Sequence, residues 1–255
     1  MIAEGSGPPV LLLHGSGPGT TAAAWAPLIA ALAPRHRVIA PDLLGFGTQP
    51  RPTGSFRSAW TEQALALVDS LELSSFAVVG NSAGGAIALA LAHARPRAVT
   101  RVVAVGSLGH PMALPAGLDE LWSYSTPSRD GARSLLELIS RDPATPQAVE
   151  ARHRATLAQP WYPELFPAPR QRWVDDLSLT REELAVISAP VLLVHGAEDR
   201  IVPAGQSEQL HRRLTELGAP ADLHIVPGAD HCFVGADLDP LVTEALEFLA
   251  RSGER

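Results

Sequence analysis

The chain contains no lysine: its 255 residues hold 20 basic side chains, and every one of them is an arginine. This absence excludes Schiff-base and pyridoxal enzymes, which need a lysine. It also excludes P-loop proteins with a G-K-[ST] motif and protein kinases with their β3 lysine. The net charge is -7 and no run of basic residues occurs, which argues against a surface for nucleic acid or for an anionic membrane.

Cysteine is almost as scarce, because Cys232 is the only one. A disulfide framework and a Cys-rich zinc site within the chain are therefore excluded. No HExxH or comparable spacing occurs, so we expect neither a metal ion nor another cofactor. The first residues lack the basic segment of a signal peptide, and no stretch approaches the ~18 apolar residues of a membrane span. We expect a cytoplasmic protein that binds a small molecule, and both a monomer and a homo-oligomer remain open.

Short β-branched and leucine-rich runs alternate with helical patterns over most of the chain. Alternation of this kind predicts βαβ units and a mostly parallel sheet with helices on both faces, an α/β fold. The predicted strands cover residues 10–13, 37–40, 76–80, 99–105, 191–195 and 223–226.

The alternation stops between residues 109 and 187. This segment holds nine of the 23 prolines, three of the five tryptophans and both tyrosines. It shows helical stretches, such as 131–140 and 146–157, and no convincing strand. An insertion here would cover the carboxyl ends of the strands, where open α/β sheets bind ligands. We predict a core of residues 1–108 and 188–255 with a helical cap of residues 109–187.

A serine lies in the sequence G-N-S-A-G-G at residues 80–85. A predicted strand precedes it and an apolar helix follows it, which is the context of a nucleophile elbow. The glycines are needed because the turn is so sharp that side chains there would collide with neighbouring backbone. The pattern predicts Ser82 as a nucleophile.

A serine hydroxyl is a poor nucleophile at neutral pH and needs a base that a third group orients. Asp199 and His231 each follow a predicted strand, so both should lie at the same edge of the sheet as Ser82. We predict His231 as the general base and Asp199 as its orienting carboxylate. Glu198 and Asp230 are competing carboxylates, but Glu198 lies one residue short of the usual position and Asp230 is typical of a turn.

A developing oxyanion needs hydrogen-bond donors. One predicted donor is the backbone N–H of Ala83, directly after the nucleophile. The loop H-G-S-G-P-G at residues 14–19 should supply a second. We expect that donor to be the N–H of Ser16, with Gly17 as the neighbouring alternative, and we expect His14 to brace the loop.

In this order, the motifs resemble an α/β-hydrolase with a helical cap, and the resemblance covers essentially the whole chain. The sequence P-D-L-L-G-F-G at residues 41–47 is similar to the D-x-x-G-x-G turn of many members. The resemblance implies the α/β-hydrolase fold, with the cap inserted after the sixth-strand position. Because the chain starts close to the first core strand, we expect the N-terminal hairpin to be absent or reduced to residues 2–5. A sheet of six strands would result.

Within that superfamily, the loop at 14–19 together with the elbow resembles the meta-cleavage product hydrolases. These enzymes cut a carbon–carbon bond in vinylogous 1,5-diketones. The sequence F-P-A-P-R-Q-R-W-V-D at residues 166–175 is similar to the 2-hydroxymuconate semialdehyde hydrolases. The segment 151–157 resembles the one that carries the family's cap arginine, so the resemblance implies that Arg152 meets the carboxylate or dienolate oxygens of the substrate. A planar guanidinium suits such bidentate contact.

Four further residues are expected to contact the substrate: Asn81, Gly17, Trp173 and Cys232. Cys232 directly follows the predicted base, at the place where the family typically has tryptophan. This departure alters the pocket wall and keeps a different substrate open.

The leading prediction is a cofactor-independent serine hydrolase that cleaves a carbon–carbon bond of a dienone or diketone. Attack would come from Ser82 or from a water that His231 activates. A carboxylesterase, lactonase or thioesterase with the same triad is the alternative. A non-catalytic ligand-binding protein on the same fold is the third reading.

Overall fold

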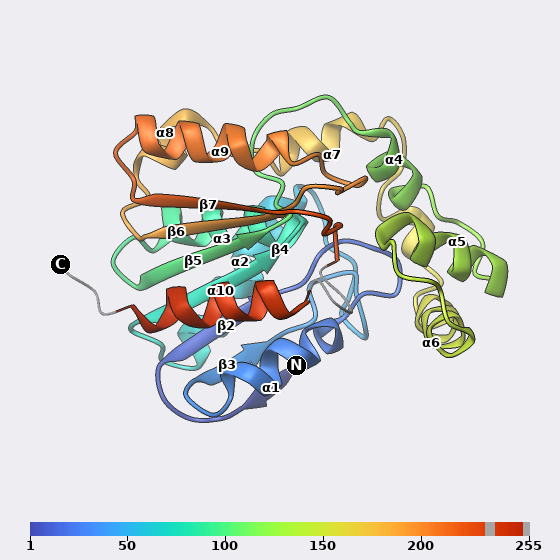
Figure 1. Cartoon of the computed structure of the whole chain (residues 1–255), viewed down its shortest axis with the longest axis horizontal. Coiled ribbons are helices and arrows are strands. Elements are labelled where there is room, and N and C mark those ends of the chain that lie inside the picture. The colour runs from blue at the N-terminus through green and yellow to red at the C-terminus, as the bar shows by residue number, and fades with distance from the viewer. Residues whose placement is uncertain (233–237, 252–255) are drawn as a thin grey trace.

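A seven-stranded sheet forms the centre of the described part of the chain, residues 1–232 and 238–251 of a computed structural model (Figure 1). Its strand order is β1-β3-β2-β4-β5-β6-β7. The first strand runs antiparallel to β3, and the other neighbouring pairs are parallel. The strands are β1 (Ile2–Glu4), β2 (Pro9–Leu13), β3 (Arg37–Ala40), β4 (Phe76–Asn81), β5 (Val99–Val105), β6 (Val191–Gly196) and β7 (Ala221–Val226).

The expectation of six strands is wrong. Ile2 pairs with Ala40 and Glu4 pairs with Val38, so β1 adds an antiparallel edge strand beside β3. The N-terminal hairpin is thus reduced to one strand. The inserted helical segment follows β5, the fifth strand of the described sheet.

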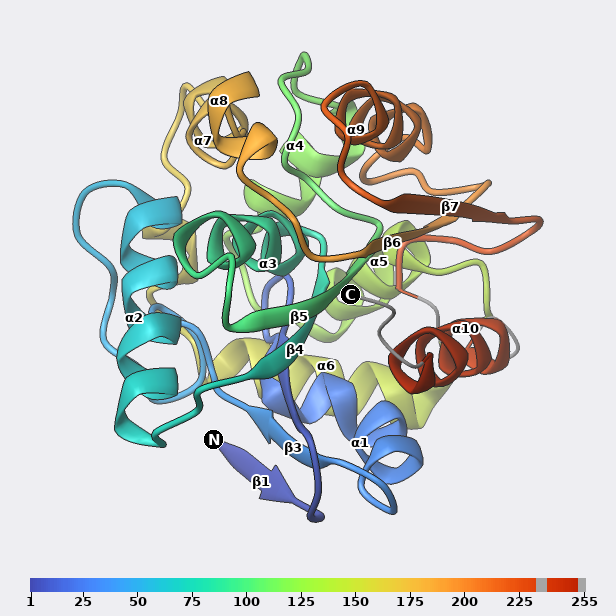
Figure 2. The ribbon, with the colours of Figure 1, turned by 90° about the vertical axis from the view of Figure 1, so that its left-hand side faces the viewer.

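Helices cover both faces of the sheet (Figure 2). One face carries α1 and α10, and the other carries α2, α3, α8 and α9. Alternate residues of β2 divide between the two: Leu12 packs on the α1 side and Leu11 on the α3 side, as expected for a strand buried on both faces. These helices are α1 (Ala26–Leu32), α2 (Phe56–Ser70), α3 (Ala83–Ala94), α8 (Arg181–Ala185), α9 (Gly205–Glu216) and α10 (Leu238–Ala250).

The inserted segment has two parts. Three helices, α4 (Ala116–Trp122), α5 (Arg129–Ile139) and α6 (Pro146–Leu157), lie together at one end of the sheet (Figure 1). By contrast, α7 (Gln171–Asp176) packs beside the core helix α2, and α8 packs against α3. The division into a core and a cap at residues 109 and 187 stays a prediction. Two short 3-10 helices, η1 (Ala22–Trp25) and η2 (Tyr162–Glu164), complete the described helices.

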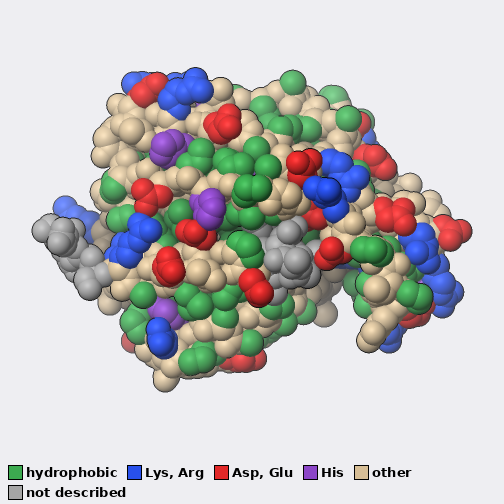
Figure 3. All heavy atoms as spheres, in the orientation of Figure 1, with side chains coloured by type: hydrophobic (Ala, Val, Ile, Leu, Met, Phe, Trp, Pro, Cys, Tyr) green, Lys and Arg blue, Asp and Glu red, His purple; other side chains and the backbone are tan. Residues whose placement is uncertain are grey.

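Charged side chains of both signs are interspersed over the face in Figure 3, which shows no extended patch of one sign. Within the described residues, no helix combines the length and the apolar character that crossing a bilayer requires.

Candidate active site

Ser82 lies between the last residue of β4 and the first residue of α3. Its backbone has a conformation that few residues other than glycine adopt. Its φ is 56° and its ψ is -119°, a strained region for a residue other than glycine. The surroundings enforce this turn. A Cβ atom on Gly80 would lie 2.1 Å from the carbonyl oxygen of Gly84, and one on Gly84 would lie 2.2 Å from that of Leu13. The N–H of Ser82 donates to the carbonyl of Val105 (2.8 Å), which ties the elbow to β5.

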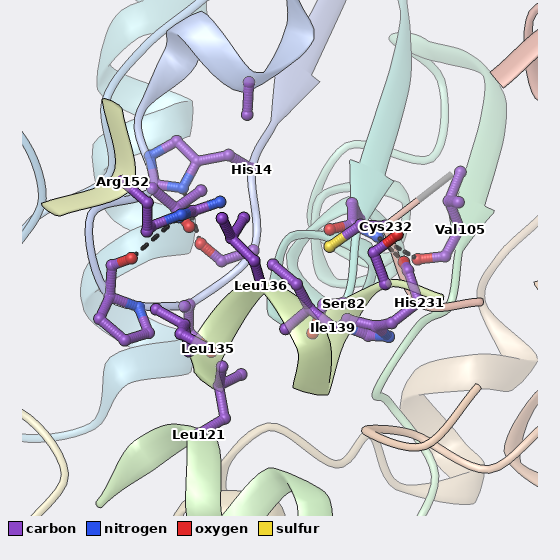
Figure 4. A pocket seen from close by; sticks show the side chains of 18 of the residues that line it. His14, Ser82, Val105, Leu121, Leu135, Leu136, Ile139, Arg152, His231 and Cys232 are labelled. Carbon is purple, nitrogen blue, oxygen red and sulfur yellow. Dashed lines mark hydrogen bonds between the residues drawn. The ribbon is translucent and has the colours of Figure 1, made fainter. Parts of the chain in front are cut away.

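A cavity of about 230 Å³ opens beside Ser82. Only 2% of the Ser82 residue surface is exposed, so its hydroxyl is largely shielded from bulk water. The wall combines residues from the sheet edge with residues from α4, α5 and α6 (Figure 4). Of the predicted site residues, those on this wall are Ser16, Gly17, Asn81, Ser82, Arg152, His231 and Cys232.

Asp199 and His231 meet as the sequence predicts. Nδ1 of His231 lies 2.7 Å from Oδ2 of Asp199. The other carboxylate oxygen, Oδ1, accepts the backbone N–H groups of Ile201 (2.8 Å) and Val202 (2.9 Å). Burial alone would raise the pKa of Asp199, but the adjacent His231 and the donated hydrogen bonds lower it well below its ordinary value. Asp199 is therefore ionised, and Nδ1 of His231 must carry the hydrogen that it accepts.

The two competing carboxylates have other positions. Glu198 is exposed. Asp230 accepts the backbone N–H of Cys232 through Oδ1 (3.1 Å) and that of Arg141 through Oδ2 (2.7 Å). It shapes the turn around His231, as expected, and it also connects that turn to the segment between α5 and α6.

Two residues of this site were missed by the sequence analysis. Gly106, directly after β5, has a φ of +50°, and a Cβ atom there would lie 3.2 Å from Nδ1 of His231. His195, at the end of β6, places Nε2 3.1 Å from Oδ2 of Asp199. The available signal was the position of His195 at the end of a predicted strand, four residues before the predicted carboxylate.

The loop after β2 is held rigidly against the elbow. Nε2 of His14 accepts the N–H of Leu43 (3.0 Å), so Nδ1 bears the hydrogen and donates it to the carbonyl of Gly15 (2.8 Å). Burial lowers the pKa of His14 and thereby favours this neutral form. His14 braces the loop, as predicted.

Ser16 is fixed by two aromatic residues of the inserted segment. The indole N–H of Trp122 donates to its hydroxyl (2.9 Å), and the Tyr162 hydroxyl donates to its carbonyl (2.9 Å). On the opposite side, Ala83 begins α3, and the first N–H groups of a helix have no partner within that helix. Ser16 lines the cavity together with Ser82, and Ala83 directly follows Ser82. The role of their N–H groups as oxyanion donors stays a prediction.

Arg152 reaches the pocket from α6. Figure 4 shows it on one side of the cavity, with Ser82, His231 and Cys232 on the other. Its guanidinium donates to the carbonyl of Pro18 (2.9 Å). No carboxylate among the described residues lies within 4.0 Å of it, and burial lowers its pKa.

Trp173 and Asn81 were also predicted to contact the substrate. Trp173 is not among the described residues that line the cavity. Its ring stacks on Phe56 (4.5 Å between centroids), because α7 packs against α2 and not over the pocket. Asn81 does line the cavity, but its amide donates to the carbonyl of Val105 (3.1 Å), so it also ties the elbow to β5.

In the part of the chain that the structure describes, no cluster of three or more His, Cys, Asp or Glu side chains is arranged to hold a metal ion. The arrangement instead offers a buried hydroxyl, an imidazole held by a carboxylate, and backbone N–H groups beside them. These are the parts that nucleophilic or general-base hydrolysis requires.

Comparisons with known proteins agree with this geometry. A family model described as "alpha/beta hydrolase fold" matches residues 8–235. A 2-hydroxymuconate semialdehyde hydrolase of Pseudomonas sp. (strain CF600) is 39% identical over 237 residues, 89% of this chain and 82% of the relative. A 2-hydroxy-6-oxo-2,4-heptadienoate hydrolase of Pseudomonas putida (strain F1) is 38% identical, over 89% of this chain and 83% of the relative.

A solved structure gives the same result. The meta-cleavage product hydrolase CumD from Pseudomonas fluorescens IP01 superposes with a TM-score of 0.89 at 35% identity. The match covers 97% of this chain and 92% of that one.

We predict that Gly106→Ala disrupts the Asp199–His231 pair. The new Cβ atom would lie 3.3 Å from Oδ2 of Asp199, and the left-handed backbone costs an L-residue about 1–2 kcal/mol. The downfield proton resonance of His231 Nδ1–H should shift or broaden, and the melting temperature should fall by several degrees. Gly205→Ala is the control, because nothing lies within 4 Å of a Cβ atom there. An unchanged resonance in Gly106→Ala would contradict this description of the site.

We predict that the Cys232 thiol resists alkylation in the folded protein. Burial is the main cause that raises the pKa of Cys232, to about 12. The thiolate, which is the reactive form, then makes up roughly one part in 10⁴ at pH 8. Iodoacetamide labelling at pH 8, followed by mass spectrometry, should be far slower in native protein than in guanidinium. Equal rates would show that the fold does not raise the pKa of this half-buried thiol.

Proposed function

Because the chain belongs to the α/β-hydrolase fold family and is a hydrolase, we propose that Ser82, His231 and Asp199 form its catalytic triad. Support comes from the protonation states that the contacts impose. Nδ1 of His231 donates a hydrogen bond to Asp199. In the neutral imidazole, Nε2 then carries no hydrogen, and its lone pair can accept a proton. Ser82 and His231 line the same cavity, so Nε2 can take a proton from the serine hydroxyl or from a water beside it.

We propose that the substrate is a dienoate that carries a ketone or aldehyde, and that the bond cleaved is a carbon–carbon bond. The relatives act, by name, on 2-hydroxymuconate semialdehyde and on 2-hydroxy-6-oxo-2,4-heptadienoate. The observation in this chain that carries the proposal is the half-buried Arg152 guanidinium on the pocket wall, which has no carboxylate neighbour among the described residues. A substrate carboxylate would supply that partner, since charge-assisted bonds to guanidinium are strong.

The proposed reaction is a net addition of water across the carbon–carbon bond. Attack on the substrate carbonyl comes from Ser82 or from water that His231 deprotonates. The N–H groups of Ala83 and Ser16 stabilise the resulting oxyanion. When the carbon–carbon bond breaks, His231 returns its proton to the departing carbon. After attack by water, the carbonyl carbon leaves directly as a carboxylic acid. After attack by Ser82, it remains as an ester on the serine oxygen, and a water that His231 deprotonates then hydrolyses this ester to the carboxylic acid and free Ser82.

Replacement of the nucleophile tests the triad. Ser82→Ala should abolish labelling by a fluorophosphonate and lower turnover by at least about 10³-fold, as triad knockouts generally do. Ser188→Ala is a suitable control, because Ser188 is exposed and bonded to the carbonyl of Pro96. Peptide mapping should find the label on Ser82 in wild type. Folded wild-type protein that takes up no label would exclude the proposed serine chemistry.

The substrate class is tested through two arginines of one helix. Arg152→Met should lower kcat/KM for a 2-hydroxy-6-oxodienoate by about 10- to 100-fold, because a hydrogen bond to a charged group contributes roughly 1.5–3 kcal/mol. Arg154→Met should have little effect, since the Arg154 side chain is 73% exposed. Loss of the dienolate absorbance measures the reaction.

A p-nitrophenyl ester serves as the neutral comparison substrate. Its hydrolysis should be nearly unaffected by Arg152→Met. Rapid ester cleavage without any turnover of the dienoate would favour the carboxylesterase alternative and would overturn the carbon–carbon assignment.

A further inference from the structure

His195 is a buried histidine that the proposed mechanism does not use. Its side chain is fully buried at the end of β6. Its Nε2 lies 2.8 Å from the carbonyl oxygen of Val202 and 3.1 Å from Oδ2 of Asp199, and its Nδ1 lies 2.7 Å from Oγ of Ser207. His195 is not among the described residues that line the cavity, so any influence on the reaction passes through Asp199.

The partners of His195 fix its hydrogens. A carbonyl oxygen and an ionised carboxylate can only accept, so Nε2 carries a hydrogen and shares it between Val202 and Asp199. Nδ1 can then accept the hydroxyl hydrogen of Ser207, a residue of α9 that is itself fully buried. The ring is therefore held on both sides, in one orientation, with its Nε2–H directed at the carboxylate.

This contact gives Asp199 a full set of donors. Oδ1 accepts the N–H groups of Ile201 and Val202. Oδ2 lies between two imidazoles, 2.7 Å from Nδ1 of His231 and 3.1 Å from Nε2 of His195. A second donor on Oδ2 restricts the rotation of the carboxylate, and it also withdraws negative charge from the oxygen that His231 uses.

We propose that His195 is a positioning residue for the hydrolytic reaction: its Nε2–H holds Oδ2 of Asp199 toward His231 and limits the negative charge that this oxygen presents to the imidazole. The proposal rests on the proposed roles of Asp199 and His231. A purely structural histidine would support the fold without influencing the proton affinity of His231, and this difference makes the proposal testable.

The sign of the effect follows from the charge. If the His195 donor is lost, Oδ2 becomes more negative and stabilises the imidazolium of His231 more strongly, so the pKa of His231 rises. Among the described residues, the other charged or titratable groups around the pair include Cys232 and Asp230 on the His231 turn, and His14 and Arg152 on the cavity wall. The variants described below leave these groups in place.

Two substitutions separate the two nitrogens of the ring. In His195→Gln, the side-chain amide nitrogen can take the place of Nε2 and still donate to Asp199. In His195→Asn, the shorter amide reaches the place of Nδ1 beside Ser207 and leaves Asp199 without its second donor. The probe is a fluorophosphonate, and the measured quantity is the second-order rate of Ser82 labelling as a function of pH. Labelling requires His231 as the neutral base, so the acidic limb of this profile reports its pKa.

The His195→Asn variant should move the acidic limb upward by about half a pH unit or more and lower the plateau rate by about tenfold. The His195→Gln variant should stay close to wild type in both respects. Thermal unfolding of each variant establishes that it is folded. If His195→Asn does not fold, Ser207→Ala replaces it. Loss of the Ser207 hydroxyl removes the partner of His195 Nδ1, so the ring is held less firmly and its Nε2–H bond to Asp199 should weaken. The acidic limb of the labelling profile should then move in the same direction as in His195→Asn, but by less.

An acidic limb at the wild-type pH in the folded His195→Asn variant, or equal shifts in Asn and Gln, would overturn the role of His195 and leave the triad intact. If wild-type protein is not labelled at Ser82, or labels without an acidic limb, the proposed triad fails and this proposal fails with it.

Discussion

One buried carboxylate organises the site. Asp199 lies just beyond β6, accepts two backbone N–H groups through one oxygen, and faces His231 and His195 with the other. Without these donors a buried charge of this kind would be too costly to keep ionised. Gly106 is part of the same constraint, because a Cβ atom there would crowd Nδ1 of His231 (3.2 Å) and Oδ2 of Asp199 (3.3 Å) and would sit on a left-handed backbone. The strands bring Ser82, Asp199 and His231 to one edge of the sheet, and the Asp199 carboxylate fixes the orientation of the His231 imidazole.

The inserted helices are connected to this centre at several points. Trp122 and Tyr162 hold the Ser16 loop, while the two loops that carry Asp199 and His231 contact the carboxyl end of α5. Arg200 donates to the carbonyl of Glu137 (2.6 Å), and Asp230 accepts the N–H just beyond that helix. Because α5 also supplies part of the apolar pocket wall, it connects that wall to the loops that carry Asp199 and His231.

The sequence predicts the local and topological features well, for a physical reason. An elbow such as that of Ser82 is specified by adjacent residues, and parallel strands bring their carboxyl ends to one edge wherever they lie in the chain. Features that depend on the packing of distant side chains were missed or wrong. The strand Ile2–Glu4 is short and has a distant partner in β3. Trp173 stacks on a core helix instead of the pocket. The contact of His195 with Asp199 depends on rotamers that no pattern encodes.

The central claim is that a substrate carboxylate binds Arg152 while the reacting carbonyl lies over Ser82. A crystal structure of the Ser82→Ala variant with a 2-hydroxy-6-oxodienoate bound would test it most directly. We expect the carboxylate on the Arg152 guanidinium and the carbonyl oxygen within hydrogen-bond distance of the N–H groups of Ser16 and Ala83. A dienoate bound in the reverse orientation, with its carboxylate away from Arg152, would contradict it.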